Sequence, residues 1–189
     1  MKVYFEQELR EESVMAVARE MMTAARTAPK ARGVDNLVIA LLNREGIVAV
    51  SDTLKAMALR DKLPDFFLRD AVNILSAQAM VLIGTKIVPM GLTPCGMCGF
   101  VDCTEKNKHP HHPCAFNTGD LGIAVGSAAS VAMDHRVDNR IMYTAGQAVL
   151  EMGLLGEEVR IAYGIPLSVS GKNPFMDRDK EALIKLAGQ

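Results

Sequence analysis

Residues 79–87 have the sequence AMVLIGTKI and are followed by thirty residues rich in Pro, Gly, Cys and His (88–117). After these comes a second apolar run, LGIAVGSAASVAM, residues 121–133. The first run is short and largely apolar, which predicts a buried strand. Asn117 or Thr118 can cap the last run as a helix, with Asp120 in its first turn. An irregular segment of that length inside a compact domain is unusual, so residues 88–117 indicate a function.

The rest of the chain predicts several helices and few strands. Asp65 and Asp138 are the expected N-caps of two of the helices. This mixture predicts an α+β layered domain over residues 1–189, into which residues 88–117 are inserted as a loop. The expected helices are 8–27, 48–61, 65–77, 138–154 and 177–187, and a strand is expected at 159–169, interrupted at 164–166. Residues 37–42 form a short apolar run that is either a buried strand or a helical turn, and strand is preferred because Asn43 and Gly46 stop the run.

The composition excludes several classes of protein. With 49% hydrophobic and 23% charged residues, the chain is not intrinsically disordered. Its net charge of −1 offers no basic field for nucleic acid. The longest uncharged apolar segment, the thirteen residues 121–133, is too short to span a membrane, and the N-terminus has no apolar stretch of signal-peptide length. We therefore expect a cytoplasmic protein without a nucleic-acid or membrane partner.

All four cysteines lie in residues 95–114, with the spacing C-x2-C-x4-C-x10-C. A disulfide framework would spread its bridges over a small secreted chain, whereas clustered cysteines more often bind metal or do redox chemistry. Gly96 and Gly99 each follow a cysteine, and a tight backbone there can point amides toward sulfur. Five apolar residues of the loop could exclude water from a redox centre: Met90, Leu92, Met97, Phe100 and Phe116.

Two kinds of metal centre fit Cys95, Cys98, Cys103 and Cys114. Four thiolates suit an iron–sulfur cluster, and [4Fe–4S] is preferred here over [2Fe–2S] although neither ferredoxin spacing is matched. They also suit a structural zinc, for which one of the loop histidines could replace a cysteine. The apolar residues and the single C-x2-C knuckle favour the cluster. The simpler interpretation of Lys106, Lys108 and the histidines is a solvated basic loop; the histidines are His109, His111 and His112.

The cysteine motif carries a resemblance. The segment CGMCGF (95–100) with Cys103, then DLGIA (120–124) and GIPLSV (164–169), resembles a family of uncharacterised proteins described as containing a ferredoxin domain. The resemblance covers most of the chain. It implies an iron–sulfur cluster on the four cysteines and no stated substrate.

A second resemblance concerns the scaffold. AARTAPKA (24–31), followed by Asn36 and an apolar strand, is similar to the segment of flavin-dependent nitroreductases that enters their flavin loop. Asp120 onward is similar to their central helix, and residues 164–166 to their late strand. The resemblance implies a nitroreductase-like homodimer with FMN at the subunit interface. Their Arg-x-Ser-x-Arg phosphate-binding stretch has no counterpart in residues 6–13.

If FMN is bound, its phosphate needs cations. Arg26, Lys30 and Arg32 follow the first helix closely, and Lys172 and Arg178 flank the last turn. These residues are candidate phosphate contacts, although charged loop residues are usually solvated. The sequence contains no catalytic triad or paired-carboxylate site, so catalytic residues stay unassigned.

Three functions remain open at this point. The chain is an iron–sulfur electron-transfer protein with or without FMN, a zinc-stabilised binding or structural protein, or an FMN-dependent oxidoreductase of a small molecule. We expect a homodimer, because the Met-rich first helix and the small face of Gly122, Gly126 and Ser130 both suit helix contacts. An acidic redox partner protein is also expected, because the loop is slightly basic.

Overall fold

The computed structural model describes residues 1–177 and 179–187. Its strands are β1 (Leu37–Leu42), β2 (Ala79–Lys86), β3 (Asp138–Asn139) and β4 (Val159–Ser168). Its α-helices are α1 (Glu6–Thr27), α2 (Arg44–Arg60), α3 (Phe66–Asn73), α4 (Cys103–Asn107), α5 (Ala115–Asp134), α6 (Tyr143–Glu151) and α7 (Lys180–Ala187). Two short 3-10 turns are η1 (Ala31–Gly33) and η2 (Ile74–Ser76).

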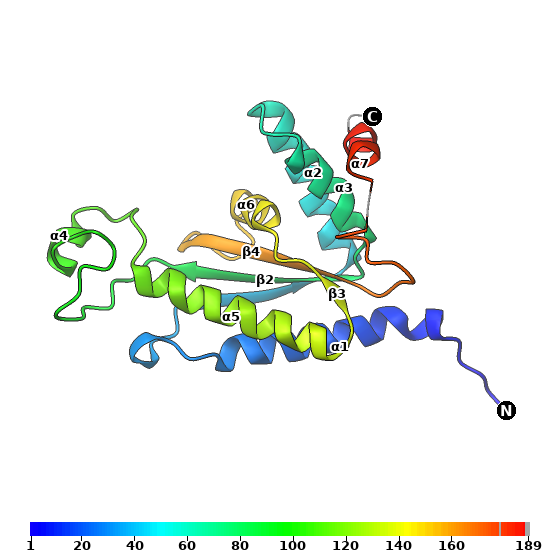
Figure 1. Cartoon of the computed structure of the whole chain (residues 1–189), viewed down its shortest axis with the longest axis horizontal. Coiled ribbons are helices and arrows are strands. Elements are labelled where there is room, and N and C mark those ends of the chain that lie inside the picture. Colours follow the sequence, from blue (N-terminus) through cyan, green and yellow to red (C-terminus); the bar gives the residue numbers. More distant parts are fainter. Residues whose placement is uncertain (178, 188–189) are drawn as a thin grey trace.

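The strands form one antiparallel sheet in the order β1-β2-β4-β3, with helices on both faces (Figure 1). Helices α1 and α5 cover one face, and α2, α3 and α6 pack on the other. This arrangement is the α+β layered architecture that the sequence predicts. None of the described helices is both long enough and apolar enough to cross a membrane.

Strand β2 is buried on both faces, which explains its largely apolar sequence. Met80 and Leu82 belong to the core under α2, α3 and α6, whereas Val81 and Ile83 belong to the core under α1 and α5. Alternate side chains of a strand point to opposite faces, so a doubly covered strand needs apolar residues at every position. Each of these large side chains contributes about 1.5–3 kcal/mol when fully buried.

Strand β4 is continuous through residues 164–166, so the expected interruption is wrong. Gly164 exchanges two backbone hydrogen bonds with Met142, at 2.8 and 3.1 Å. Backbone N–H groups alternate in direction along a strand, so the nitrogen of Pro166 faces the same side as Gly164. Beyond Met142 that side carries only the two-residue β3, so the missing donor of Pro166 leaves no gap in the pairing with β2.

The expected helix 138–154 is also wrong over its first five residues. Asp138 and Asn139 pair with β4 as strand β3, and α6 begins only at Tyr143. The Asp138 side chain is not a cap: its Oδ1 accepts a hydrogen bond from Asn173 Nδ2 at 2.9 Å. Pairing with a distant strand has therefore overridden the local capping signal.

The N-terminal capping of three other helices can be compared with the sequence prediction. Helix α2 begins four residues early because Asn43 Oδ1 accepts the Gly46 N–H at 3.1 Å. Asp65 does occupy the N-cap position of α3, but its side chain makes no capping hydrogen bond. Helix α5 begins at Ala115, with Cys114 rather than Asn117 or Thr118 at its N-cap position.

Candidate metal centre

The cysteine loop, residues 88–114, extends from one end of the sheet and carries the short helix α4 (Figure 1). It leaves β2 and returns into α5. Its base is closed by Asn117, whose Oδ1 accepts the Val88 N–H at 2.8 Å. The side chain proposed as a helix cap therefore holds the two ends of the loop together.

All four cysteines line one cavity inside this loop. Cys114 is buried, Cys98 and Cys103 are half-buried, and Cys95 is exposed. The cavity volume is about 10 Å³, near the minimum that can hold one water molecule. Apart from the cysteines and one lysine, the lining is apolar: Pro89, Met90, Leu92, Ala115 and Phe116.

The glycines explain how the first two cysteines reach the same cavity. Gly96 and Gly99 have φ values of 97° and 88°, which side-chain-bearing residues rarely adopt. The Gly99 N–H donates to the Gly96 carbonyl at 2.9 Å and closes a tight turn between Cys95 and Cys98. This is the local backbone that the spacing predicts.

Helix α4 brings Cys103 to the cavity. Asp102 caps the helix, because its Oδ1 accepts the Glu105 N–H at 2.8 Å. Lys106 is only 2% exposed and lines the cavity with the four cysteines. The expectation that Lys106 is solvated is therefore wrong, whereas Lys108 is exposed and pairs with Glu105 at 2.6 Å.

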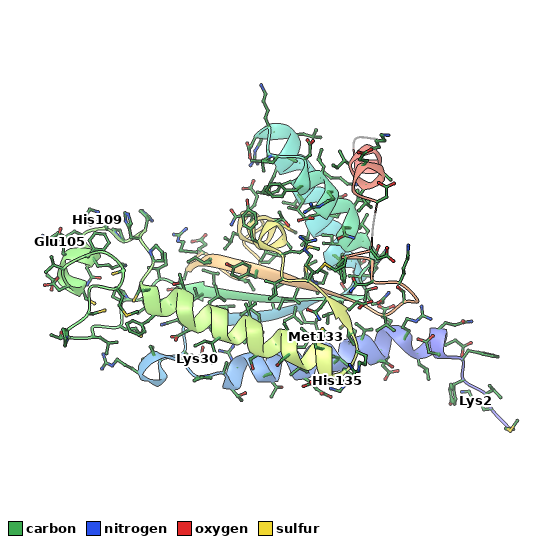
Figure 2. The ribbon with its side chains drawn as sticks, in the orientation of Figure 1. Lys2, Lys30, Glu105, His109, Met133 and His135 are labelled. Atoms are coloured by element: carbon green, nitrogen blue, oxygen red, sulfur yellow. The ribbon has the colours of Figure 1, made fainter. Side chains whose placement is uncertain are left out.

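Two of the expected water-excluding residues lie elsewhere. Met97 is 70% exposed, and Phe100 stacks on His109 with ring centroids 5.1 Å apart. His112 meets the same phenyl ring edge-on at 5.4 Å. The histidines are not among the residues that line the cavity, and all three are exposed. Figure 2 shows His109 and Glu105 on this loop, at the end of the molecule away from Lys2.

The four sulfur atoms share a cavity but do not form a site for one ion. Within residues 1–177 and 179–187, no three His, Cys, Asp or Glu side chains are placed to hold a single metal ion. A tetrahedral zinc with sulfur at about 2.3 Å needs four close sulfurs, whereas a cluster distributes its thiolates over several irons.

Three of the proposed flavin contacts already have partners within the protein. Arg26 Nη1 pairs with Asp35 Oδ2 at 2.6 Å, and Lys30 donates to the carbonyl oxygens of Ala25, Arg26 and Ala28. Burial alone would raise the pKa of Asp35. The Arg26 hydrogen bond and the Leu37 N–H outweigh it, so the pKa lies below the usual value.

The third cation, Arg32, connects the η1 turn to the cysteine loop. Arg32 Nη1 donates to the Met90 carbonyl at 2.7 Å. Beside it, both carboxylate oxygens of Asp120 accept the Ala31 N–H at 3.1 Å. The residue expected in the first turn of a helix is thus a buried link between α5 and η1.

Lys172 lies at the opposite end of the sheet from these three cations. Lys172 follows the end of β4, where Leu167 pairs with Ala79 of β2. The η1 turn precedes the start of β1, where Leu37 pairs with Thr85 of β2. Ala79 and Thr85 are roughly 20 Å apart along β2, so the two groups of cations are separated by about that distance. Arg178 lies outside the described residues. Lys172 lines a separate pocket of about 420 Å³ together with polar residues that the sequence did not single out: Arg10, Asn73, Ser76, Gln78, Ser168 and Ser170.

Comparison with known proteins identifies the family to which this sequence is similar. A family model described as "Uncharacterized protein containing a ferredoxin domain" matches residues 110–178, which include Cys114 but not the other three cysteines. An uncharacterized protein of Archaeoglobus fulgidus is 36% identical over 180 residues, covering 92% of this chain and 96% of that protein. The ferredoxin-domain description supports a redox role.

Several solved flavoprotein structures share the fold. A nitroreductase with bound FMN from Desulfitobacterium hafniense has a TM-score of 0.58 at 14% identity, covering 88% of this chain and 84% of its own. A BluB-like flavoprotein from Clostridium difficile 630 has a TM-score of 0.55 at 17% identity, covering 92% and 84%. A nitroreductase family protein from Clostridium novyi has a TM-score of 0.57 at 12% identity, covering 89% and 79%. The scaffold is therefore nitroreductase-like, as the sequence resemblance implies.

Proposed function

Because this chain belongs to the family of uncharacterized proteins that contain a ferredoxin domain, we propose that it is an iron–sulfur electron-transfer protein. The observation that carries the proposal is the single apolar-walled cavity lined by all four cysteines. We assign the cluster to Cys95, Cys98, Cys103 and Cys114. A zinc site is the alternative, and the apolar lining of the cavity favours the cluster over it.

A bound cluster would supply one-electron transfer. The chain's contribution is to supply four thiolates, to exclude water with Met90, Leu92 and Phe116, and to offer backbone amides near Gly96 and Gly99. Both common cluster types use four thiolates, so all four cysteines would be needed as ligands and no iron would stay open to a substrate. We prefer [4Fe–4S] over [2Fe–2S].

Anaerobic purification followed by iron, sulfide, zinc and flavin analysis tests the proposal. We expect brown protein that contains iron and sulfide in matching amounts. A Mössbauer spectrum should not change when small molecules are added, because all irons are ligated by the protein. Stoichiometric zinc without sulfide would contradict the cluster and leave the structural-zinc function in its place.

FMN is a second cofactor that we propose for the same scaffold, and the neighbouring structure with bound FMN supports it. The pocket beside Lys172 suits its phosphate better than the η1 region, because Arg26, Lys30 and Arg32 already bind groups of the protein. The pocket also contains carboxylate neighbours: Arg10 pairs with Glu6 at 2.5 Å and Lys172 with Asp177 at 3.3 Å. Phosphate would have to compete with both.

Equilibrium dialysis with FMN would test the flavin and separate an oxidoreductase from a pure electron carrier. Lys172→Ala should weaken FMN binding at least several-fold, whereas Lys30→Ala should leave it unchanged. The reverse result would return the phosphate site to the η1 region. No binding to the unchanged protein would leave the cluster as its cofactor.

We also propose that two copies of the chain associate through α5. Gly122, Gly126 and Ser130 are exposed, and a methyl group added at either glycine would contact nothing within 4 Å. A backbone this open permits close helix contact. Sedimentation at micromolar concentration should show a dimer, and a monomer would contradict this proposal and weaken the flavin proposal.

The docking surface for a redox partner is smaller than the sequence suggests, since Lys106 is buried. Lys108 and the three histidines remain exposed on the loop, together with Met97 and Val101. We propose an acidic partner protein for this surface, with binding that weakens as salt rises. A cytoplasmic location, where thiols stay reduced, also remains a proposal.

A further inference from the structure

Lys106 is the most unusual side chain of the cysteine loop. It is 2% exposed, and it is among the largest fully buried side chains of the described residues. Its helix, α4, starts at Cys103, so one turn of backbone carries both a candidate ligand and the lysine. Lysine is almost never fully buried unless its charge is paired.

The described residues offer Lys106 no pairing group. None of the salt bridges and side-chain hydrogen bonds of residues 1–177 and 179–187 involves the Lys106 ammonium, and that nitrogen is not among the buried polar atoms left without a partner, so the burial is that of the methylene stem. The two nearest acidic residues in sequence are committed elsewhere, since Asp102 caps α4 and Glu105 pairs with Lys108. A positive charge next to an apolar interior with no carboxylate to balance it is unfavourable.

The side chain does have chemically suitable neighbours. Lys106 lines the cavity with the four cysteines, and the remaining lining is apolar. Four thiolates around a cluster give the centre a net negative charge. A cation at the edge of that low-dielectric interior interacts with the charge more strongly than a fully solvated one.

We propose that Lys106 offsets the negative charge of the four-cysteine centre and thereby raises its reduction potential. The inference rests on the proposed cluster. Reduction brings one further electron, and hence one further negative charge, from an external donor to the centre. A fixed positive charge stabilises the reduced state more than the oxidised state. Nearby charge is one of the protein's controls on cluster potential.

A purely structural function makes a different prediction. If Lys106 only fills space with its methylene groups, methionine of similar length should replace it without an electrostatic consequence. If its charge matters, arginine should restore the behaviour that methionine loses. Lys108 supplies a matched control, because it lies two residues away, carries the same charge, and is exposed and paired with Glu105.

The experiment is an anaerobic redox titration, followed by electron paramagnetic resonance, of the full chain and of Lys106→Met, Lys106→Arg and Lys108→Met. We expect Lys106→Met to lower the ratio of reduced to oxidised cluster at least tenfold at a fixed potential. That change equals a fall of about 59 mV for one electron. Lys106→Arg should stay near the parent protein, and Lys108→Met should shift much less, because solvent screens its charge.

Iron and sulfide contents keep the two proposals separate. Zinc without sulfide in the unchanged protein would overturn the proposed function and this inference with it. A cluster present in the unchanged protein, with an unchanged potential in Lys106→Met, would overturn the inference alone. Lys106→Met can also lose the cluster altogether. In that case, a cluster retained in Lys106→Arg supports the inference. Loss of the cluster in both variants would overturn the inference in favour of a packing function.

Discussion

The sheet and the cysteine loop differ in how much of their apolar surface is buried. In the sheet, Val81, Leu82 and Ile83 are completely buried between two layers of helices. In the loop, Met97 and Val101 are 70% and 89% exposed, and the cysteines surround a space of about 10 Å³. The sheet is held by apolar cores alone, whereas the interior of the loop places four cysteines and one buried lysine among apolar residues.

The difference indicates that the sheet provides the stability of the fold, whereas the loop provides the cofactor site. The scaffold has two apolar cores and can be stable without a metal. The loop is attached to it by polar contacts of Asn117 with Val88 and of Arg32 with Met90, and Asp120 holds the η1 turn that carries Arg32. Changes in the sheet should therefore alter stability, changes in the loop should alter cofactor content, and the contacts between them should alter both.

The largest expected effect is the loss of the cluster in Cys98→Ser. A serine hydroxyl is a poor substitute for a thiolate in a four-cysteine set, so iron and sulfide should fall to background. The free energy of unfolding of the metal-free protein should change by less than about 0.5 kcal/mol, because Cys98 is only half-buried. Metal analysis and urea unfolding measure the two quantities.

Met97→Ser is the matched control, since Met97 is adjacent and exposed. It should keep full iron content. A cluster that survives Cys98→Ser intact would remove Cys98 from the ligand set.

The next effect concerns the sheet alone. A methyl group at Gly146 in α6 would lie 1.8 Å from the Ala162 carbonyl oxygen of β4. Gly146→Ala therefore forces α6 and β4 to move apart. We expect a loss of about 3 kcal/mol in urea unfolding. Iron per folded molecule should be unchanged, and a large fall in iron content would show that the two regions are not independent.

Gly122→Ala in α5 is the control for helix propensity, because nothing lies within 4 Å of the added methyl group. It should stabilise the monomer by up to about 1 kcal/mol. If it also weakens dimerisation, the small face of α5 is the subunit contact.

A smaller effect is expected where the two regions meet. Asp120→Ala removes both acceptors of the Ala31 N–H and leaves that group without its partner. The cost should be about 1–2 kcal/mol. Because η1 also holds Met90 through Arg32, the cluster should be lost to a chelator faster than in the parent protein. Thr118→Ala, which removes only a local hydrogen bond to Ala115, should show neither change.

The smallest effect is a pH dependence at Asp35. Its pKa is lowered overall, because hydrogen bonds from Arg26 and the Leu37 N–H outweigh its partial burial. Asp35 therefore stabilises the fold above its unfolded pKa of about 3.9, and the contribution is lost as pH falls through the folded value. Asp35→Asn should cost about 0.5 kcal/mol at pH 7, allowing for solvent screening. Unfolding curves of the two proteins should converge at acidic pH, and a constant difference would contradict this origin.

Much of the scaffold could be predicted because its signals are local and repeated. The first helix follows from apolar periodicity, the strands 37–42 and β2 follow from short apolar runs, and the structure confirms all three. The short strand β3 could not be predicted, because residues 138–139 become a strand only through pairing with Leu167 and Ser168, far along the chain.

The candidate site also has a part that the sequence predicts and a part that it does not. Spacing identifies the four cysteines, which the structure brings to one cavity. Burial of Lys106 has no sequence signal, because α4 has only five residues and shows no periodicity. The separation of Lys172 from Arg32 depends on strand direction, which composition does not encode.

Pro166 has a consequence for aggregation. An antiparallel sheet can grow when a strand of another molecule pairs with its open edge. Next to β4, Pro166 has no N–H to offer, Gly164 is already bonded to Met142, and residues 167–168 are covered by β3. An incoming strand would find partners only along residues 159–162, which is shorter than a typical strand of about five or six residues. This side of the sheet resists edge-to-edge polymerisation, so contacts between copies of the protein there must use helices and loops.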